Sequence, residues 1–352
     1  MKKYAVLVAG GTGGHINAAL AVGEALTEQG YEILYLTGKR PLDYKLFHGQ
    51  KVRHLDSKPL RTNNPIILIK NIFFNFISFV SIFFLYLSKR PHFIVGAGGY
   101  VCGPTLLAGY LQRVPVFIIE QNAVMGLTNK ILGWISRRIF VHFTKTKGLS
   151  KSLVPKVRVV GNPTRKSIQP VPKKIFDQKL KVLVFGGSLG ATQINKVIFD
   201  ILKTPPVENL SIHHQLGSGL AHPESSTTAE YRPMEYIDNI QSEYEWCDVI
   251  IARAGASTVS ELAIIKKPVL IFPYPQATDN HQLFNAQIFK EESDFTVEVL
   301  DPKTPHAESV KRTKEFLVKA SQEALKYSQT PHSGNHTCSE ILKEIQEHVG
   351  MA

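Results

Sequence analysis

The feature that most constrains this chain is a local pattern that occurs twice: a short strand, a glycine-rich turn and then a helix. The first copy has a buried strand at 4–9, the turn Gly10 to His15 and an amphipathic helix over 16–29. The second copy has a buried strand at 181–185, the turn Gly186 to Ala191 and another helix. The two copies begin 176 residues apart, half of the 352-residue chain. We therefore predict two similar domains rather than one long sheet.

Short β-branched strands alternate with helical segments along each half. Further strands are expected at 32–36, 93–95, 116–119 and 139–141. This alternation is typical of a parallel α/β sheet, so we predict two doubly wound domains. We place them at 1–162 and 163–335, joined by a stretch rich in proline and lysine at 161–181. A second break precedes a short final helix within 336–352.

Composition and charge narrow the function classes. With 43% hydrophobic and 20% charged residues, a disordered or collagen-like chain is excluded. The three cysteines lie far apart, which argues against a disulfide framework and suits a reducing cytoplasm, and we expect no signal peptide. The net charge of +12 attracts polyanions such as anionic lipid, phosphorylated substrates or nucleic acid. Because no zinc-finger or RNA-recognition pattern is present, nucleic acid is not an expected partner.

Three glycine-rich turns point to a phosphate-bearing ligand. The third turn, Gly96 to Pro104, follows the strand at 93–95. Glycines let a backbone approach a ligand, and a helix start offers free N–H groups to phosphate, although glycine turns can also simply end strands. NAD is not expected, because Ile16 stands where a dinucleotide fingerprint needs glycine. An ATPase loop is not expected either, because Gly103 is followed by Pro104.

An ordered set of short motifs carries a family resemblance. The set is Gly10 to His15, Gly98 to Pro104, Glu120-Gln121-Asn122, Gly126 to Lys130, Val160 to Arg165, Gly186 to Ala191, Arg253 to Glu261, and Gln282. Together these motifs closely resemble the MurG family, the UDP-N-acetylglucosamine transferases that make lipid II of bacterial peptidoglycan. The resemblance implies the GT-B architecture, two Rossmann-like domains facing a cleft with the last helix crossing back to the first domain. It also implies inverting transfer of N-acetylglucosamine (GlcNAc) from UDP-GlcNAc to lipid I.

The chain departs from the family pattern at several positions. Ile119 replaces a usual histidine, which puts in doubt the acceptor role of that histidine. Cys102 stands where serine is common, and Leu189 where glutamine is common. The run from Ile16 to Ala19 lacks the proline that usually follows the first glycine turn.

The resemblance assigns donor-binding residues, mainly in the second domain. They are Thr12, Gly13, Gly14, Asn122, Arg165, Ser188, Ile237, Ala256, Ser257, Thr258, Val259, Ser260, Glu261 and Gln282. Ser188 would meet the diphosphate at a helix start, and Glu261 would accept bonds from the ribose hydroxyls, unless it is a plain helix-surface glutamate. Ile237 would contact uracil through its backbone, and Gln282 the sugar hydroxyls.

Inverting transfer needs a base for the acceptor hydroxyl. His15, at the end of the first glycine turn, is the candidate base or the group that positions the acceptor phosphate, since the helix dipole favours its neutral form. A capping or packed histidine is the alternative. Glu120 is a second catalytic candidate, and Gly98, Gly99, Tyr100 and Asn129 are acceptor-side candidates. Without an Asp-x-Asp pair after a strand, we expect no metal, and we expect no other cofactor.

The segment 66–87 is strongly apolar and contains six phenylalanines. Its polar residues recur every three to five positions, which gives a helix with a narrow polar stripe. They are Lys70, Asn71, Asn75, Ser78 and Ser81, with Ser88 just beyond. Flanking charges at Arg61, Lys89 and Arg90 favour anionic lipid. We predict a membrane-facing amphipathic helix rather than a core helix or a span, and a peripheral enzyme on the cytoplasmic face of the inner membrane.

Two other functions stay open at this level. A UDP-sugar 2-epimerase on the same fold would leave the apolar helix unexplained, because such an enzyme has no lipid acceptor. A non-catalytic sugar-nucleotide-binding subunit would usually hold one domain, whereas this chain is expected to hold both.

Overall fold

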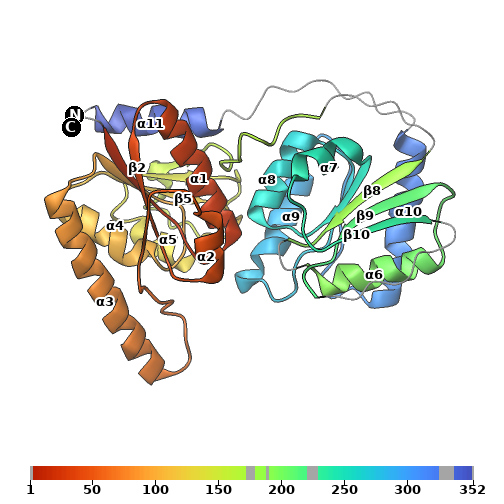
Figure 1. The fold of residues 1–352 in the computed structure, drawn as a ribbon, viewed down its shortest axis with the longest axis horizontal. Helices are drawn as coiled ribbons and strands as arrows, with labels where there is room; N and C mark the ends of the chain where they lie inside the picture. Colours follow the sequence, from red (N-terminus) through yellow and green to blue (C-terminus); the bar gives the residue numbers. More distant parts are fainter. Residues whose placement is uncertain (1–2, 172–178, 188–189, 220–228, 325–336, 351–352) are drawn as a thin grey trace. The chain divides into compact units, whose positions relative to one another are not determined.

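The computed structural model describes residues 3–171, 179–187, 190–219, 229–324 and 337–350. The chain divides into two compact units, Met1–Lys166 with Asn335–Ala352, and Ser167–Gly334. Each unit is an α/β layer structure of its own (Figure 1). The prediction of two parallel-sheet domains is therefore confirmed.

The first unit is built on a seven-stranded parallel sheet in the order β3-β2-β1-β4-β5-β6-β7. Its strands are β1 (Tyr4–Val8), β2 (Glu32–Thr37), β3 (Val52–His54), β4 (Phe93–Gly96), β5 (Val116–Glu120), β6 (Arg138–Val141) and β7 (Val157–Val159). Its helices are α1 (Gly13–Glu28), α2 (Pro41–Leu46), α3 (Pro65–Ser88), α4 (Cys102–Leu111), α5 (Leu127–Leu132), the 3-10 turn η1 (Val154–Lys156) and α11 (Thr337–Val349). Strands β1, β4 and β5 are buried at every position, as expected for parallel strands covered on both faces.

The second unit repeats this order in a six-stranded parallel sheet, β10-β9-β8-β11-β12-β13. Its strands are β8 (Leu180–Phe185), β9 (Leu210–Gln215), β10 (Ala229–Met234), β11 (Val249–Ala252), β12 (Val269–Ile271) and β13 (Val297–Val299). Its helices are α6 (Thr192–Lys203), α7 (Ile240–Trp246), α8 (Ala256–Ile265), the 3-10 turn η2 (Thr278–Asn280), α9 (His281–Glu292) and α10 (His306–Ala324). Both sheets run third, second, first, fourth in chain order, so the repeat in the sequence corresponds to a repeated Rossmann-like topology.

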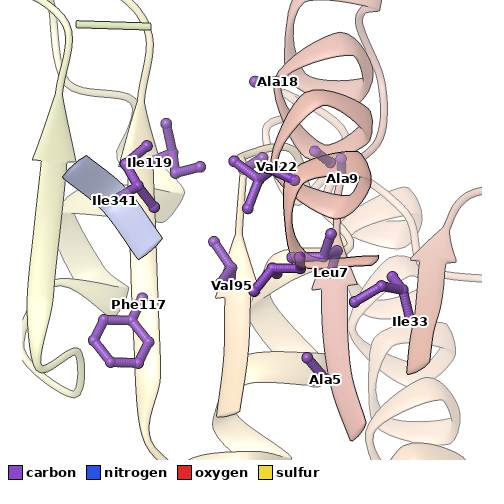
Figure 2. Close-up of a cluster of buried hydrophobic side chains, with 14 of the residues drawn as sticks. Ala5, Leu7, Ala9, Ala18, Val22, Ile33, Val95, Phe117, Ile119 and Ile341 are labelled. Carbon is purple, nitrogen blue, oxygen red and sulfur yellow. The ribbon is translucent and has the colours of Figure 1, made fainter. Parts of the chain in front are cut away.

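The final helix belongs to the first unit. Ile341 and Ile345 of α11 are fully buried in the cluster that joins β1, β4 and β5 to α1. Figure 2 shows Ile341 together with Ile119 and Val22 of that cluster. Burying each isoleucine side chain stabilises this contact by about 1.5–3 kcal/mol. Glu344 adds ion pairs to Arg138 and Arg158, at 3.3 and 3.1 Å.

Helix α1 begins three residues earlier than the sequence pattern predicts. Thr12 is its N-cap, with extended backbone angles and a side-chain oxygen that accepts the His15 N–H. Glycines 13 and 14 are poor helix formers, which is why the apolar periodicity pointed to Ile16 as the start. The consequence is that His15 lies in the first turn of the helix rather than in the preceding loop.

Candidate functional site

Each sheet has a topological switch point, where the chain order reverses between two neighbouring strands. These neighbours are β1 and β4 in the first unit, and β8 and β11 in the second. Open α/β sheets bind ligands in the crevice at the carboxyl ends of such strands. The segments that follow these four strands are 9–12, 97–101, 186–191 and 253–255. All of the glycine-rich motifs found in the sequence therefore lie at one of the two switch points.

In the first unit the two glycine turns press directly on each other. A β-carbon on Gly99 would lie 2.2 Å from the carbonyl oxygen of Gly10. A β-carbon on Gly98 would lie 2.9 Å from the imidazole of His15. Gly98 and Gly99 also have positive φ, +103° and +92° respectively, which side-chain-bearing residues rarely adopt. These positions need glycine for packing within the unit, whether or not a ligand binds there.

His15 is held in a single tautomer by its own turn. Its Nδ1 lies 3.1 Å from the carbonyl oxygen of Gly10, and since a carbonyl only accepts, Nδ1 carries the proton. In the neutral ring Nε2 then carries the lone pair, as a general base requires. The adjoining first turn of α1, formed by Gly13 and Gly14, contains no acidic residue. Its N–H groups and the helix dipole therefore favour an anion beside His15.

A cation that the sequence analysis did not single out lies next to this turn. The guanidinium of Arg40 stacks 5.0 Å from the ring centre of Tyr100 and donates to the carbonyl oxygen of Gly11 at 3.2 Å. Burial raises the pKa of Tyr100, so its phenol stays protonated at neutral pH. The signal available in the sequence was an arginine three residues after the end of β2, at the carboxyl edge of the sheet.

The carboxylate of Glu120 is buried and fully engaged by donors. It is 2% exposed. Oε2 accepts from the Gly126 N–H and from Asn129 Nδ2, both at 2.9 Å. Oε1 accepts from the backbone N–H and side-chain amide of Asn122, at 3.1 and 3.4 Å. These bonds fix the loop after β5.

Two departures from the family pattern have simple physical explanations. Ile119 is fully buried in the core cluster shown in Figure 2, so an apolar side chain suits its position. The Cys102 thiol donates to the carbonyl oxygens of Gly98 and Val8, at 3.3 and 3.5 Å, as a serine hydroxyl would. Burial raises the pKa of Cys102 to about 12, so it remains a thiol.

In the second unit the segment after β11 leads into α8. Ala256, Val259, Ser260 and Glu261 are buried, while Ser257 and Thr258 in the first turn are half-buried. The Ser260 hydroxyl donates to the Ala256 carbonyl oxygen at 2.7 Å. Glu261 receives a hydrogen bond from the Tyr244 hydroxyl, 2.8 Å from its Oε2. Neither Tyr244 nor this contact was predicted from the sequence.

Arg253 begins the same segment and is buried without a carboxylate partner among the described residues. Its Nη1 donates to Gln193 Oε1 at 3.0 Å and to the carbonyl oxygens of Phe272 and Pro273, at 3.0 and 3.2 Å. Burial lowers the pKa of Arg253 to about 10, which still leaves it charged at neutral pH. A buried cation balanced only by neutral groups favours an anion at this switch point.

The remaining donor candidates are less constrained. Gln282 lies in the first turn of α9, and its Oε1 accepts the Tyr274 N–H at 2.9 Å, which leaves its amide NH₂ to donate to a ligand. Ile237 is half-buried in the segment after β10, and Arg165 is exposed in the first unit. Ser188 and Leu189 lie outside the described residues. Within the described ranges, no group of three or more His, Cys, Asp or Glu side chains is placed to hold a metal ion.

Helix α3 has its polar and apolar faces reversed relative to an ordinary surface helix. Most of its polar stripe, though not the exposed Lys70, contacts the protein: Asn71 Nδ2 donates to the Pro59 carbonyl oxygen, and Asn75 Nδ2 to that of Lys58, both at 2.8 Å. Ser81 accepts from Arg53 on β3 at 2.7 Å. Only Ser78, Ile82 and Tyr86 of the helix are buried. Because so little of α3 is buried, the alternative of a wholly buried core helix is wrong.

The apolar face of α3 is exposed. Its exposed residues include Ile66, Ile69, Ile72, Phe73, Phe76, Phe84 and Leu87, and Phe73 and Phe76 are each 60% exposed. The first half of the helix extends beyond the rest of its unit (Figure 1). Further exposed apolar residues occur on α4, which packs on α3, and on α5: Leu107, Leu111, Leu127 and Ile131. By length and composition α3 could cross a membrane, with a mean hydropathy of 2.0 over an 18-residue window that is 17% buried.

Comparison with known families and proteins agrees with this architecture. Residues 5–141 match the glycosyltransferase family 28 N-terminal domain, and residues 181–344 match the glycosyltransferase family 28 C-terminal domain. A protein of Psychromonas ingrahamii is 37% identical over 302 residues, covering 81% of this chain and 82% of the relative. It is named UDP-N-acetylglucosamine–N-acetylmuramyl-(pentapeptide) pyrophosphoryl-undecaprenol N-acetylglucosamine transferase. A Shewanella loihica protein of the same name is 35% identical, with 82% of each chain covered.

Solved structures show the same likeness. The crystal structure of Acinetobacter baumannii MurG matches with a TM-score of 0.74 and 26% identity, covering 98% of this chain and 99% of that one. The UDP-GlcNAc 2-epimerase of Neisseria meningitidis matches with a TM-score of 0.62 but only 14% identity, over 98% of this chain and all of that one. The second match shows a shared fold and no more.

Proposed function

Because this chain belongs to glycosyltransferase family 28 and to the MurG family within it, we propose that it moves GlcNAc from UDP-GlcNAc to an undecaprenyl-pyrophosphoryl-N-acetylmuramyl-pentapeptide, lipid I. The product is lipid II of peptidoglycan synthesis. The observation that carries the assignment of residues is that each unit has its family motifs at its own switch point, His15 in one and Glu261 in the other.

The chemistry follows from inverting transfer. Nε2 of His15 accepts the proton of the acceptor hydroxyl while that oxygen forms a bond to the anomeric carbon of GlcNAc. The bond from the anomeric carbon to the phosphate oxygen breaks, and UDP leaves with the electron pair from the opposite side. The negative charge on UDP is balanced by Arg253 and by the N–H groups at the starts of α6 and α8.

The other candidates have supporting roles. Glu261 accepts hydrogen bonds from the ribose hydroxyls, the Gln282 amide donates a hydrogen bond to the sugar, and the Ile237 backbone contacts uracil. Gly98, Gly99 and Tyr100 form the acceptor side. Thr12, Gly13 and Gly14 stay donor-side candidates, because the N–H groups at the start of α1 can receive a phosphate of the donor. Glu120, saturated by its donors, acts through the loop that it holds with Asn122 and Asn129 rather than through proton transfer.

The lipid acceptor requires the enzyme to work at a membrane surface. The outward apolar face of α3 supports docking into the lipid headgroup region. The exposed Arg61, Lys70 and Arg90 would contact anionic lipids, as would Lys89, which also pairs with Glu32 at 2.8 Å. The inward hydrogen bonds of Asn71 and Asn75 support a helix that stays attached to its unit rather than crossing the bilayer. The proposed location is the cytoplasmic face of the inner membrane, where the protein is peripheral.

The decisive experiment is incubation of the purified chain with UDP-GlcNAc, with and without a soluble lipid I analogue. We expect UDP release only when the acceptor is present, together with a product that contains one more GlcNAc. Conversion of UDP-GlcNAc to its 2-epimer without acceptor would instead support an epimerase. Binding of UDP-GlcNAc with neither reaction would support a non-catalytic subunit.

A further inference from the structure

Tyr244 is the only residue of α7 that is buried, and it is 0% exposed. Its hydroxyl donates to Oε2 of Glu261 on α8, which is itself 7% exposed. The proposed mechanism gives Tyr244 no role. We propose that Tyr244 is a positioning residue for nucleotide recognition: it holds the Glu261 carboxylate in the orientation that receives the ribose hydroxyls. This inference rests on the proposed role of Glu261 in donor binding.

A glutamate that reads two hydroxyls needs its carboxylate plane fixed. The terminal torsion of glutamate is broad, so the backbone of α8 alone does not set the direction of the two oxygens. A carboxylate offers about four lone-pair sites, and the Tyr244 hydroxyl occupies one of those on Oε2. That bond fixes the rotation of the carboxylate and therefore the directions in which its other lone pairs accept. Ribose then binds a carboxylate that is already ordered.

Tyr244 is itself rigidly held, which a positioning residue requires. The buried ammonium of Lys267, just before β12, donates to the Tyr244 carbonyl oxygen at 2.6 Å and also to that of Cys247. The Tyr244 ring packs edge-on against Phe185, with 6.2 Å between ring centres. Phe185 is the last residue of β8, directly before the glycine turn at the switch point. Tyr244 is therefore held by the end of β8 and by the residue that leads into β12.

The inference predicts a specific loss of ribose recognition when the hydroxyl is removed. The measurement is the dissociation constant of each of two ligands, UDP and 2′-deoxy-UDP, by titration calorimetry. The readout is the dissociation constant of 2′-deoxy-UDP divided by that of UDP. We expect the wild type to prefer UDP, because the deoxy ligand leaves a buried carboxylate lone pair unpaired. In Tyr244→Phe the ratio should fall by about three- to tenfold, mainly through weaker binding of UDP.

Two further variants separate the possible failures. Tyr231→Phe removes a phenol oxygen from the same unit, where it bonds the ring of His214 at 3.1 Å, and should leave the ratio unchanged. Glu261→Gln should lower the ratio, and adding Tyr244→Phe to it should lower the ratio no further. If Glu261→Gln keeps the wild-type ratio, the ribose role of Glu261 is wrong and the inference falls with it.

If Glu261→Gln lowers the ratio but Tyr244→Phe does not, the donor assignment stands and the positioning role of Tyr244 is overturned. The same holds if Tyr244→Phe weakens both ligands equally and lowers the melting temperature as Tyr231→Phe does, because that result describes a purely structural tyrosine.

Discussion

The imidazole of His15 lies against the α-carbon of Gly98, where a β-carbon would be 2.9 Å from both Cδ2 and Nε2 of the ring. The proposed base and the second glycine turn are therefore one packed unit. The position of the histidine depends on a residue 83 positions away in the sequence.

Gly98→Ala should displace His15 and lower turnover by about tenfold or more, because small errors in the position of a base are costly. The positive φ of Gly98 adds about 1–2 kcal/mol of strain, so the free energy of unfolding should fall as well. Gly103→Ala is the matched control, since nothing lies within 4 Å of a β-carbon there. Steady-state kinetics and urea melts of both variants test this contact, and equal turnover of the two would contradict it.

His15→Ala and Glu120→Gln should fail in different ways. Loss of the base should lower kcat by about a hundredfold or more while UDP-GlcNAc binding persists. Glu120→Gln places an NH₂ group among donors such as the Gly126 N–H, so it should cost about 1–3 kcal/mol of folding stability. Calorimetric titration with the donor, kinetics and thermal melts distinguish the two. A His15→Ala enzyme with near-normal turnover at saturating acceptor would make His15 a structural residue.

Phenylalanines of α3 should divide into two classes. Phe73 and Phe76 are exposed, and burying each ring in a bilayer should stabilise membrane binding by about 2 kcal/mol. The double variant Phe73→Ser, Phe76→Ser should therefore lose binding to anionic vesicles. The melting temperature of this double variant should equal that of the wild type. Phe83 packs on the core beneath the helix, so Phe83→Ser should lower the melting temperature instead.

Vesicle flotation at low and high salt, with a circular dichroism melt of each variant, measures both effects. Binding should also weaken with added salt, because exposed basic residues contribute about 1 kcal/mol each. Protein that resists release by high salt and alkaline wash would show that α3 crosses the bilayer.

The second unit should lose stability in acid because of His214. This ring is fully buried between Asn195 Oδ1 and the Tyr231 hydroxyl, each at 3.1 Å, and burial lowers its pKa to about 3. The unfolded chain takes up a proton near pH 6.5 and the folded ring does not, so stability falls as the pH drops from 6.5 toward 3. At pH 5 the loss amounts to about 2 kcal/mol.

His214→Gln retains one donor and one acceptor without the titration, and its acid sensitivity should be smaller by that amount. Urea melts at pH 7 and pH 5 for wild type and variant provide the test. His142 in the first unit, with a pKa lowered by burial to about 4, titrates in both proteins and cancels in the comparison.

The positions of β1, β2, β4, β5, β6 and β8 and the place of the glycine turns were predictable because they depend on local patterns: apolar runs, turn residues and helical periodicity. The contact of Tyr244 with Glu261 was not, because it depends on how α7 and α8 pack after β11 is placed between them. The saturation of Glu120 was equally hidden, since two of its donors are backbone N–H groups that any sequence could supply.

The polar stripe of α3 was visible in the sequence, but the side of the helix that meets the protein was not. Asn71 and Asn75 donate to the backbone carbonyl oxygens of Pro59 and Lys58, in the segment before the helix. Every residue has a backbone carbonyl, so the sequence does not reveal these partners. The polar face of a helix normally faces solvent. In α3 most of it faces the protein instead, because the carbonyl groups of residues 58 and 59 accept its hydrogen bonds.

That reversal has a consequence for handling the protein. Most helices bury their apolar face when the chain folds, and that burial stabilises the fold. The apolar outer face of α3 stays exposed in the folded chain, so it is buried only when another molecule covers it. In plain buffer the available covering is another copy, so concentrated samples should self-associate through this face, and mild detergent or lipid should disperse them. The same exposed apolar side chains thus limit solubility and provide membrane binding. A variant that stays monomeric in concentrated solution because these side chains were made polar should therefore bind membranes poorly.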